Sequence, residues 1–289
     1  MVSEQKITPN PLVGLMRQPK IFIRLPSGGE YWEAGSIDVP DNREFPVYSM
    51  TARDELMLKV PDALMNGQAV VDVIQHCMPN IKNAWKAPNL DLDAILIAIR
   101  IATYGEKMTI PLRISDEVDN EYTLDLRIVL DGLQNQISWD PVVPINDDLT
   151  VYVRPLSYKV MTDSALQTFE TQKIIQLVSD DAIPEEQKIA AFKESFAKLN
   201  QMTIGVINNS VFKVESSQGT TVDQRHIQDF MTNADKTVFD KVKNHIDKLR
   251  ENNSIKPLKI ATTPEMRAAG VVEDEIEYPL QFDPTNFFV

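Results

Sequence analysis

The sequence predicts an α+β protein in which a mixed strand-and-helix domain precedes a mainly helical domain. Three observations support this class: an apolar helical segment at residues 92–104, alternating strand-like segments around it, and helical periodicity over roughly ninety residues from Thr162. A C-terminal strand is a candidate to return to the first domain. The predicted organisation is an arm (1–19), a mixed domain (20–155), a helical domain (156–255) and a C-terminal extension (256–289).

The mixed domain begins with strand signals. Residues 21–25 alternate apolar and polar side chains, residues 26–29 form a Pro-Ser-Gly-Gly turn, and Tyr31-Trp32 resume extended structure. This order predicts a hairpin-like entry, with residues 45–50 as a further strand.

Helix signals follow. Thr51 with Asp54 predicts a capping box, and residues 68–78 carry apolar side chains at helical spacing. Asp91 is placed to cap the helix at residues 92–104. Gly105 stands where a left-handed C-terminal cap is expected. Because this helix is apolar on most faces, we expect it at the centre of the first core.

Two strands are predicted next, at residues 108–114 and 121–130, and a shorter one at 150–154. The second would place alternate residues on one inward face. These are Tyr122, Leu124, Leu126, Ile128 and Leu130.

The helical domain opens with two long helices. Leu166, Phe169, Ile174 and Leu177 mark the first. Pro184 opens the second, in which Ile189, Phe192, Phe196 and Leu199 recur at spacings of three and four. This stripe is typical of an antiparallel helical pair or a short coiled coil.

Shorter elements complete the chain. We expect a brief strand at residues 211–215, helices at 223–231 and 234–250, and a terminal strand at 275–282.

Composition excludes several classes of partner. The net charge of −13 disfavours binding to nucleic acid and to anionic membranes. We expect no secretion signal, and the apolar stretch at residues 92–102 is shorter than the ~20 residues that span a bilayer. One cysteine allows no intrachain disulfide and suits a reducing cytoplasm.

No catalytic or metal site is predicted, and no cofactor is expected. The sequence contains no P-loop, dinucleotide fingerprint or nucleophile elbow. Cys77 lies on the apolar stripe of its helix and is interpreted as a buried structural thiol, beside His76. Paired acids such as Asp91 and Asp93 are interpreted as helix caps or loop residues. Arg100, in an apolar helix, would need a carboxylate partner if buried.

The C-terminal aromatic cluster is the candidate partner-binding site. Large apolar groups near a chain end need a docking surface, either this chain's own core, which we slightly favour, or a neighbouring subunit. The candidate residues are Phe282, Asp283, Pro284, Phe287 and Phe288.

An ordered series of segments resembles the baseplate hub and hub-assembly proteins of T-even-type contractile-tail bacteriophages. The similar segments are residues 21–32, 48–56, 61–67, 94–105, the helical stretch near 196–211, and 282–288. The resemblance implies a non-enzymatic protein of the virion baseplate, or of the host cytoplasm during assembly. Its partners would be other hub or tail proteins, and an oligomer is compatible with it.

The chain departs from this family pattern in one region. Some relatives carry paired cysteines that suggest zinc binding, whereas residues 263–270 contain no cysteine. A zinc role is therefore not carried over.

Three functions stay open. The first is a hub component or hub-assembly factor that acts through protein–protein binding. The second is a transient tail-assembly chaperone that is not retained in the virion. The third, a remote alternative, is a hydrolytic enzyme, which would need convergent acids and a perturbed histidine in one cleft.

Overall fold

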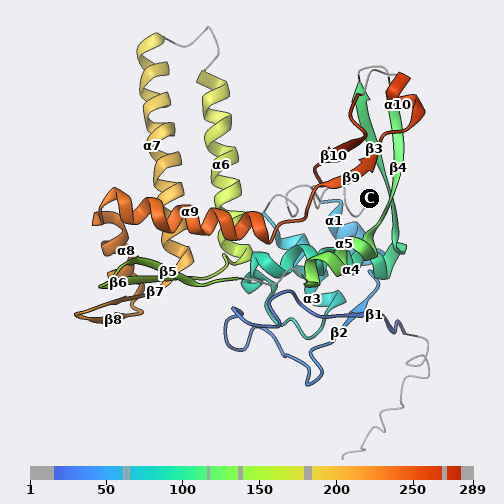
Figure 1. Cartoon of the computed structure of the whole chain (residues 1–289), viewed down its shortest axis with the longest axis horizontal. Coiled ribbons are helices and arrows are strands. Elements are labelled where there is room, and N and C mark those ends of the chain that lie inside the picture. Colours follow the sequence, from blue (N-terminus) through green and yellow to red (C-terminus); the bar gives the residue numbers. More distant parts are fainter. Residues whose placement is uncertain are drawn as a thin grey trace, which may run out of the picture.

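The computed structural model describes residues 16–60, 63, 66–115, 118–135, 139–178, 184–268 and 272–280. Helices and small antiparallel sheets build two hydrophobic cores, and a helical hairpin projects beside them (Figure 1). This arrangement confirms the predicted α+β class.

The first core surrounds helix α4 (Asn89–Tyr104), as the sequence predicts. Ile95, Ile97 and Ile99 on α4 are fully buried, because the helix is apolar on most of its circumference. The elements around it are β1 (Pro19–Ile23), β2 (Phe45–Tyr48), α1 (Ala52–Leu58), α3 (Gln68–Cys77) and the short 3-10 helix η2 (Ala84–Lys86).

The expected capping box of α1 is confirmed. The Thr51 hydroxyl accepts a hydrogen bond from the Asp54 backbone N–H, and the Asp54 carboxylate accepts one from the Thr51 backbone N–H at 2.7 Å. Gly105 ends α4 with φ of 93° and ψ of 178°. The positive φ favours glycine, but the expected left-handed helical cap is not formed.

Two expectations are wrong, one about the entry segment and one about the start of α4. Strand β1 pairs antiparallel with β2 and not with residues 31–32, because Tyr31 has a positive φ of 64° and the chain there forms turns. Asp91 does not cap α4. The helix begins earlier, at Asn89, with Pro88 as its N-cap residue. Asp91 lies within the first turn, and its carboxylate forms hydrogen bonds with other residues.

The predicted strand at residues 121–130 is only half correct. Strand β3 (Lys107–Ser115) pairs with β4 (Val118–Asp125), and the chain then enters α5 (Leu126–Asn135). Leu126 and Leu130 suit both periods, and buried Leu133 continues a helical face. Ile128, expected to point inward, is 72% exposed.

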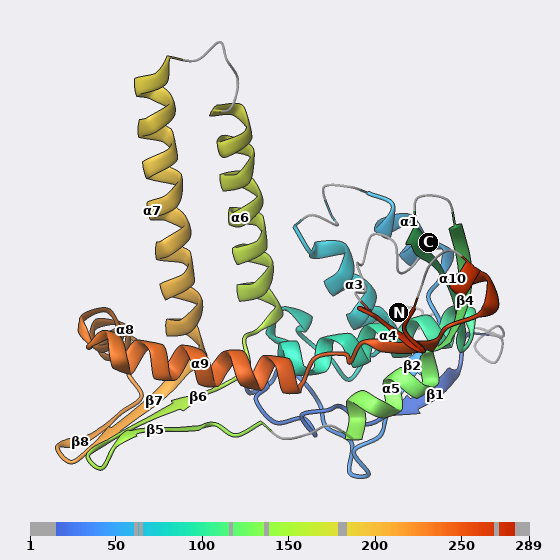
Figure 2. The ribbon, with the colours of Figure 1, turned by 45° about the horizontal axis from the view of Figure 1, so that its top comes forward.

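The second core contains a four-stranded antiparallel sheet in the order β5-β6-β7-β8. Helices α8 (Gln224–Asn233) and α9 (Lys236–Asn252) contribute Ile227, Val242 and Ile246 to the core of this sheet (Figure 2). The strands are β5 (Val142–Asn146), β6 (Leu149–Val153), β7 (Val211–Ser216) and β8 (Gly219–Thr221). Strands β5 and β6 therefore belong to the second core, although they precede residue 155.

Helices α6 (Tyr158–Val178) and α7 (Glu185–Ser210) leave this core as the expected antiparallel pair (Figures 1 and 2). In chain order the two helices lie between β6 and β7. The hairpin is thus an insertion into the sheet.

The C-terminal segment returns to the first core, which was the option that the sequence left open. Strand β9 (Leu258–Ala261) pairs with β10 (Glu275–Tyr278), and α10 (Pro264–Ala268) lies between them in the chain. Ile260 and Met266 pack with Tyr122 of β4.

Candidate functional site

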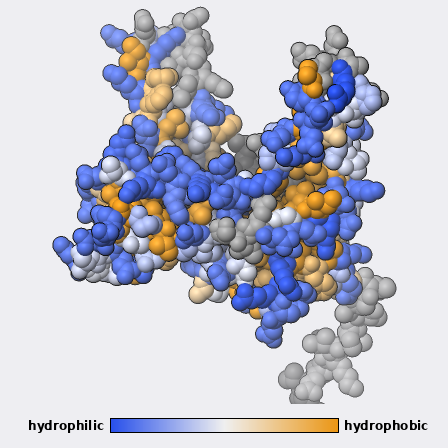
Figure 3. All heavy atoms as spheres, in the orientation of Figure 1, coloured by the Kyte–Doolittle hydropathy of each residue, from blue (hydrophilic) through white to orange (hydrophobic). Residues whose placement is uncertain are grey.

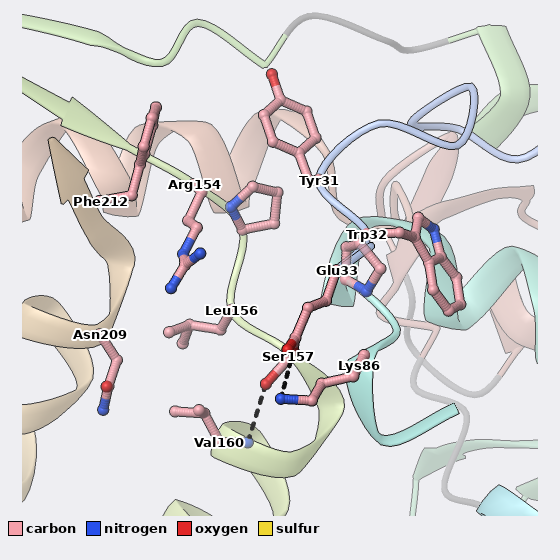
Figure 4. A pocket seen from close by; sticks show the side chains of 12 residues that line it. Tyr31, Trp32, Glu33, Lys86, Arg154, Leu156, Ser157, Val160, Asn209 and Phe212 are labelled. Carbon is pink, nitrogen blue, oxygen red and sulfur yellow. Dashed lines mark hydrogen bonds and ion pairs between the residues drawn. The ribbon is translucent and has the colours of Figure 1, made fainter. Parts of the chain in front are cut away.

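A cleft of about 620 Å³ lies where the two cores meet (Figure 4). The loop after β1 and helix η2 form one wall, and β7 with the end of α7 forms the other. The segment that links β6 to α6 lies between them. The side chains that line the cleft include Tyr31, Trp32, Glu33, Lys86, Arg154, Leu156, Ser157, Asn209 and Phe212.

The linking segment is fixed by backbone pairing with the residues before α4. The Asn89 N–H donates to the Leu156 carbonyl, and the Tyr158 N–H donates to the Ala87 carbonyl, both at 2.8 Å. The ring of Tyr158 stacks on that of Trp85, with centroids 5.5 Å apart. These contacts therefore fix the end of the linker and the start of α6 to the first core.

Asp91 anchors the loop that carries Tyr31 and Trp32. Its fully buried carboxylate accepts hydrogen bonds from the Ser27 N–H at 2.7 Å, the Ser27 hydroxyl at 2.5 Å and the Trp32 indole N–H at 2.7 Å. Burial raises the pKa of Asp91 to about 6, although these three hydrogen bonds oppose the rise. A polar residue of the central helix therefore positions one wall of the cleft.

The charges in the cleft are unevenly compensated. Glu33 and Lys86 form an ion pair at 2.5 Å across the first wall. The backbone N–H of Arg154 donates to the Ser210 carbonyl. The exposed guanidinium of Arg154 has no hydrogen bond or ion pair with another described residue. Figure 4 shows this side chain between Phe212 and Leu156. The cleft thus combines aromatic walls with one uncompensated cation.

This combination suits recognition of a protein segment. Tyrosine, tryptophan and arginine are the residues that most often dominate binding energy at protein interfaces. An arginine that is not already paired can bind a carboxylate through two hydrogen bonds. The chemistry favours a ligand that places an acidic side chain beside an apolar one.

The predicted interpretation of Cys77 agrees with its surroundings. The thiol is buried, and burial raises its pKa to about 11, which disfavours the nucleophilic thiolate. Its neighbour His76 instead places Nδ1 2.6 Å from the Asp54 carboxylate. Burial alone would raise the pKa of Asp54, but hydrogen bonds from Thr51 and His76 outweigh burial and lower it. Arg17 completes the cluster by donating to the Ser49 and His76 carbonyls.

Two acids of α1 pair elsewhere, and Arg100 lies against an aromatic ring of its own helix. Asp54 pairs with His76, and Glu55 accepts from the Tyr104 hydroxyl at 3.1 Å. The Arg100 guanidinium lies 5.1 Å from the centre of the Tyr104 ring. Its role is therefore within the first core and away from the cleft.

Among the residues that the structure describes, no group of three or more His, Cys, Asp and Glu side chains could hold a metal ion. None of the described helices combines the length and apolarity that crossing a membrane requires.

The predicted partner-binding residues Phe282, Asp283, Pro284, Phe287 and Phe288 lie outside the described residues. The sequence did not point to the cleft, because Tyr31, Arg154 and Phe212 are far apart along the chain. The Tyr-Trp pair after the Gly-Gly turn was the one available signal.

Comparison with known proteins identifies the family. A family model described as T4 bacteriophage base plate protein matches residues 19–261, which cover both cores, the hairpin and strand β9. The chain therefore belongs to this family of bacteriophage baseplate proteins. No curated protein matches the chain significantly, and no solved structure does.

Proposed function

We propose that this baseplate protein is a hub component or hub-assembly factor that works by binding other tail proteins and not by catalysis. The observation that carries the proposal is the cleft between the two cores. Its walls belong to different cores, so a segment bound there would contact both at once. Such binding suits a protein that must fix neighbours in one geometry.

The expected ligand is an extended segment of another baseplate protein. Tyr31, Trp32 and Phe212 would contact its apolar side chain, and Arg154 would pair with its carboxylate. The Glu33–Lys86 pair adds no net charge, so Arg154 determines the sign of the ligand's charge. On a chain of net charge −13, this local cation also discriminates against non-specific basic partners.

Reversing the charge of Arg154 tests the proposal. We expect Arg154→Glu to weaken binding to baseplate proteins by about tenfold or more, because a carboxylate would face the ligand's carboxylate. The tagged variant would replace the wild-type chain during infection, with captured baseplate proteins quantified by mass spectrometry and infectious particles counted.

The matched control is Arg53→Glu, the same charge change at an exposed position on α1. Both variants should melt within a few degrees of the wild-type chain, because neither guanidinium has a partner among the described residues. If the two variants bind and assemble equally well, the cleft is not the binding site.

The transient chaperone is the second candidate. The acidic surface favours it, because net charge improves solubility and speeds electrostatically steered encounter. The same cleft would serve a client that later leaves. Retention in the virion separates the two roles.

A further inference from the structure

Helix α7 carries a row of apolar side chains that α6 does not cover. Ile189, Phe192 and Phe196 are 51%, 47% and 50% exposed, and the two phenylalanine rings lie with centroids 4.9 Å apart. Figure 3 shows apolar surface on the projecting hairpin, well away from both cores. A contiguous row of this kind on a projection costs solubility unless another surface buries it.

Two other side chains of the hairpin are buried. Thr171 and Ser195 are buried at 0% and 3% exposure, and the Thr171 hydroxyl donates to the carbonyl of Gln167, four residues earlier. Phe196 follows Ser195 by one residue, so it points about 100° away around the helix. The hairpin therefore buries two small polar side chains and leaves the two phenylalanines of α7 half exposed.

The spacing of the row identifies the kind of surface that it suits. Ile189, Phe192, Phe196 and Leu199 are separated by three, four and three residues. This is the spacing of the two core positions in a heptad, which packs against another helix as knobs into holes. The matching surface is therefore a helix with an apolar stripe.

The charges of α6 and α7 favour a second copy of this chain as the source of that helix. Helix α6 contains two lysines and two acidic residues, and α7 contains three of each, so both helices are formally neutral. The whole chain has a net charge of −13. Two copies would repel each other over most of their surface, whereas α6 and α7 themselves add no net charge to a contact between their sides. Asp180 and Asp181, in the sequence between the two helices, are the only excess charges of the hairpin.

We propose that two copies of the chain pair through their α6–α7 hairpins, with the apolar row of α7 buried against the same row of the second copy. A two-fold interface of this kind uses one self-complementary patch twice, and this row supplies such a patch. The resulting unit is a four-helix bundle between two subunits. The cleft is elsewhere, so this inference does not depend on the proposed ligand of the cleft.

Analytical ultracentrifugation of the full chain tests the pairing. We expect a dimer of the 32.7 kDa chain, and the double variant Phe192→Glu, Phe196→Glu should raise its dissociation constant about 100-fold or more. Both phenylalanines are half exposed, so circular dichroism should show an unchanged helical content. The matched control is Ile128→Glu on α5, which is 72% exposed and should leave the dissociation constant unchanged.

Cross-linking gives a second readout. Phe196→Cys should be joined to the second copy by a short bis-maleimide, whereas the wild-type chain should not react, because its one cysteine, Cys77, is buried. A chain that stays monomeric at about 100 µM overturns the proposal. A dimer that the double variant leaves intact also overturns it, and so does a row that binds only a different baseplate protein.

Discussion

Asp91 and Asp93 are two acids of α4 with opposite surroundings. Three donors converge on Asp91, whereas Asp93 has no hydrogen bond or ion pair with another described residue. Burial raises the pKa of each to about 6. A pKa that is higher in the folded state than in the unfolded state means that folding stability falls as pH rises from about 4 to about 6.

The same substitution at these two positions should act in opposite directions. At pH 7, Asp91→Asn should lower the free energy of unfolding by about 2–4 kcal/mol, because an amide cannot accept from all three donors. Asp93→Asn should raise it by about 1 kcal/mol and flatten the slope between pH 4 and 6, because it removes a desolvated charge. Urea unfolding at several pH values measures both. Shifts of the same sign would contradict this assignment of the two carboxylates.

Sequence reasoning at the residue scale succeeded where the partner is local. The Thr51–Asp54 capping box was predicted correctly, since its partners lie three residues apart. Asp91 was misassigned as a cap, because its partners Ser27 and Trp32 are 64 and 59 residues away. The sequence did not single out Arg154. Its proposed role depends on a guanidinium that pairs with no other described residue, and this is visible only in the folded chain.

At the scale of single elements, the N-cap residue of helix α3, Gly67, lies close to helix α6. Gly67 has φ of 78°, and a Cβ there would lie 3.0 Å from Thr162 Cγ2 and 3.1 Å from the Tyr158 hydroxyl. Only glycine accommodates both the backbone conformation and this close approach to α6.

Replacing Gly67 should therefore loosen the junction between the cores. We expect Gly67→Ala to lower the free energy of unfolding by about 1–3 kcal/mol through the positive φ and the contact with α6. The control Gly132→Ala, in α5 with open space around it, should raise the same free energy by about 0.5–1 kcal/mol. Thermal or chemical unfolding measures both. An equal effect of the two changes would show that the approach of α3 to α6 is unimportant.

The elements that sequence reasoning missed share a physical cause. Leu126 and Leu130 are four residues apart, a spacing common to a strand face and a helix face, so α5 was assigned to a strand. The stripe on α7 was detected, but periodicity cannot distinguish a buried stripe from an exposed one. Small polar residues such as Thr171 and Ser195 carry no periodic apolar signal, although they are buried.

At the scale of the whole molecule, the fold class and family were predictable, whereas the grouping of elements was less so. Strand β6, which ends at Val153, pairs with β7, which begins 58 positions later at Val211. The inserted hairpin separates them in sequence. The cleft depends on this long-range pairing, so the sequence alone did not reveal it.

The two surfaces give the molecule two separate uses. The cleft would hold a segment of another baseplate protein, and the hairpin would hold a second copy of this chain. Because the α7 row spans residues 189–199 and the cleft includes α7 only at Asn209, Arg154→Glu should leave the dimer intact, and the double variant of the α7 row should leave ligand binding by each subunit intact. Avidity from two linked clefts would strengthen attachment to a symmetric baseplate.

Quantitative mass spectrometry of purified virions and of tail-assembly intermediates tests the central claim most directly. We expect the chain to be present in virions at a fixed ratio to other baseplate proteins. Presence in the intermediates alone would select the chaperone. Absence from both virions and intermediates would contradict a baseplate role of either kind.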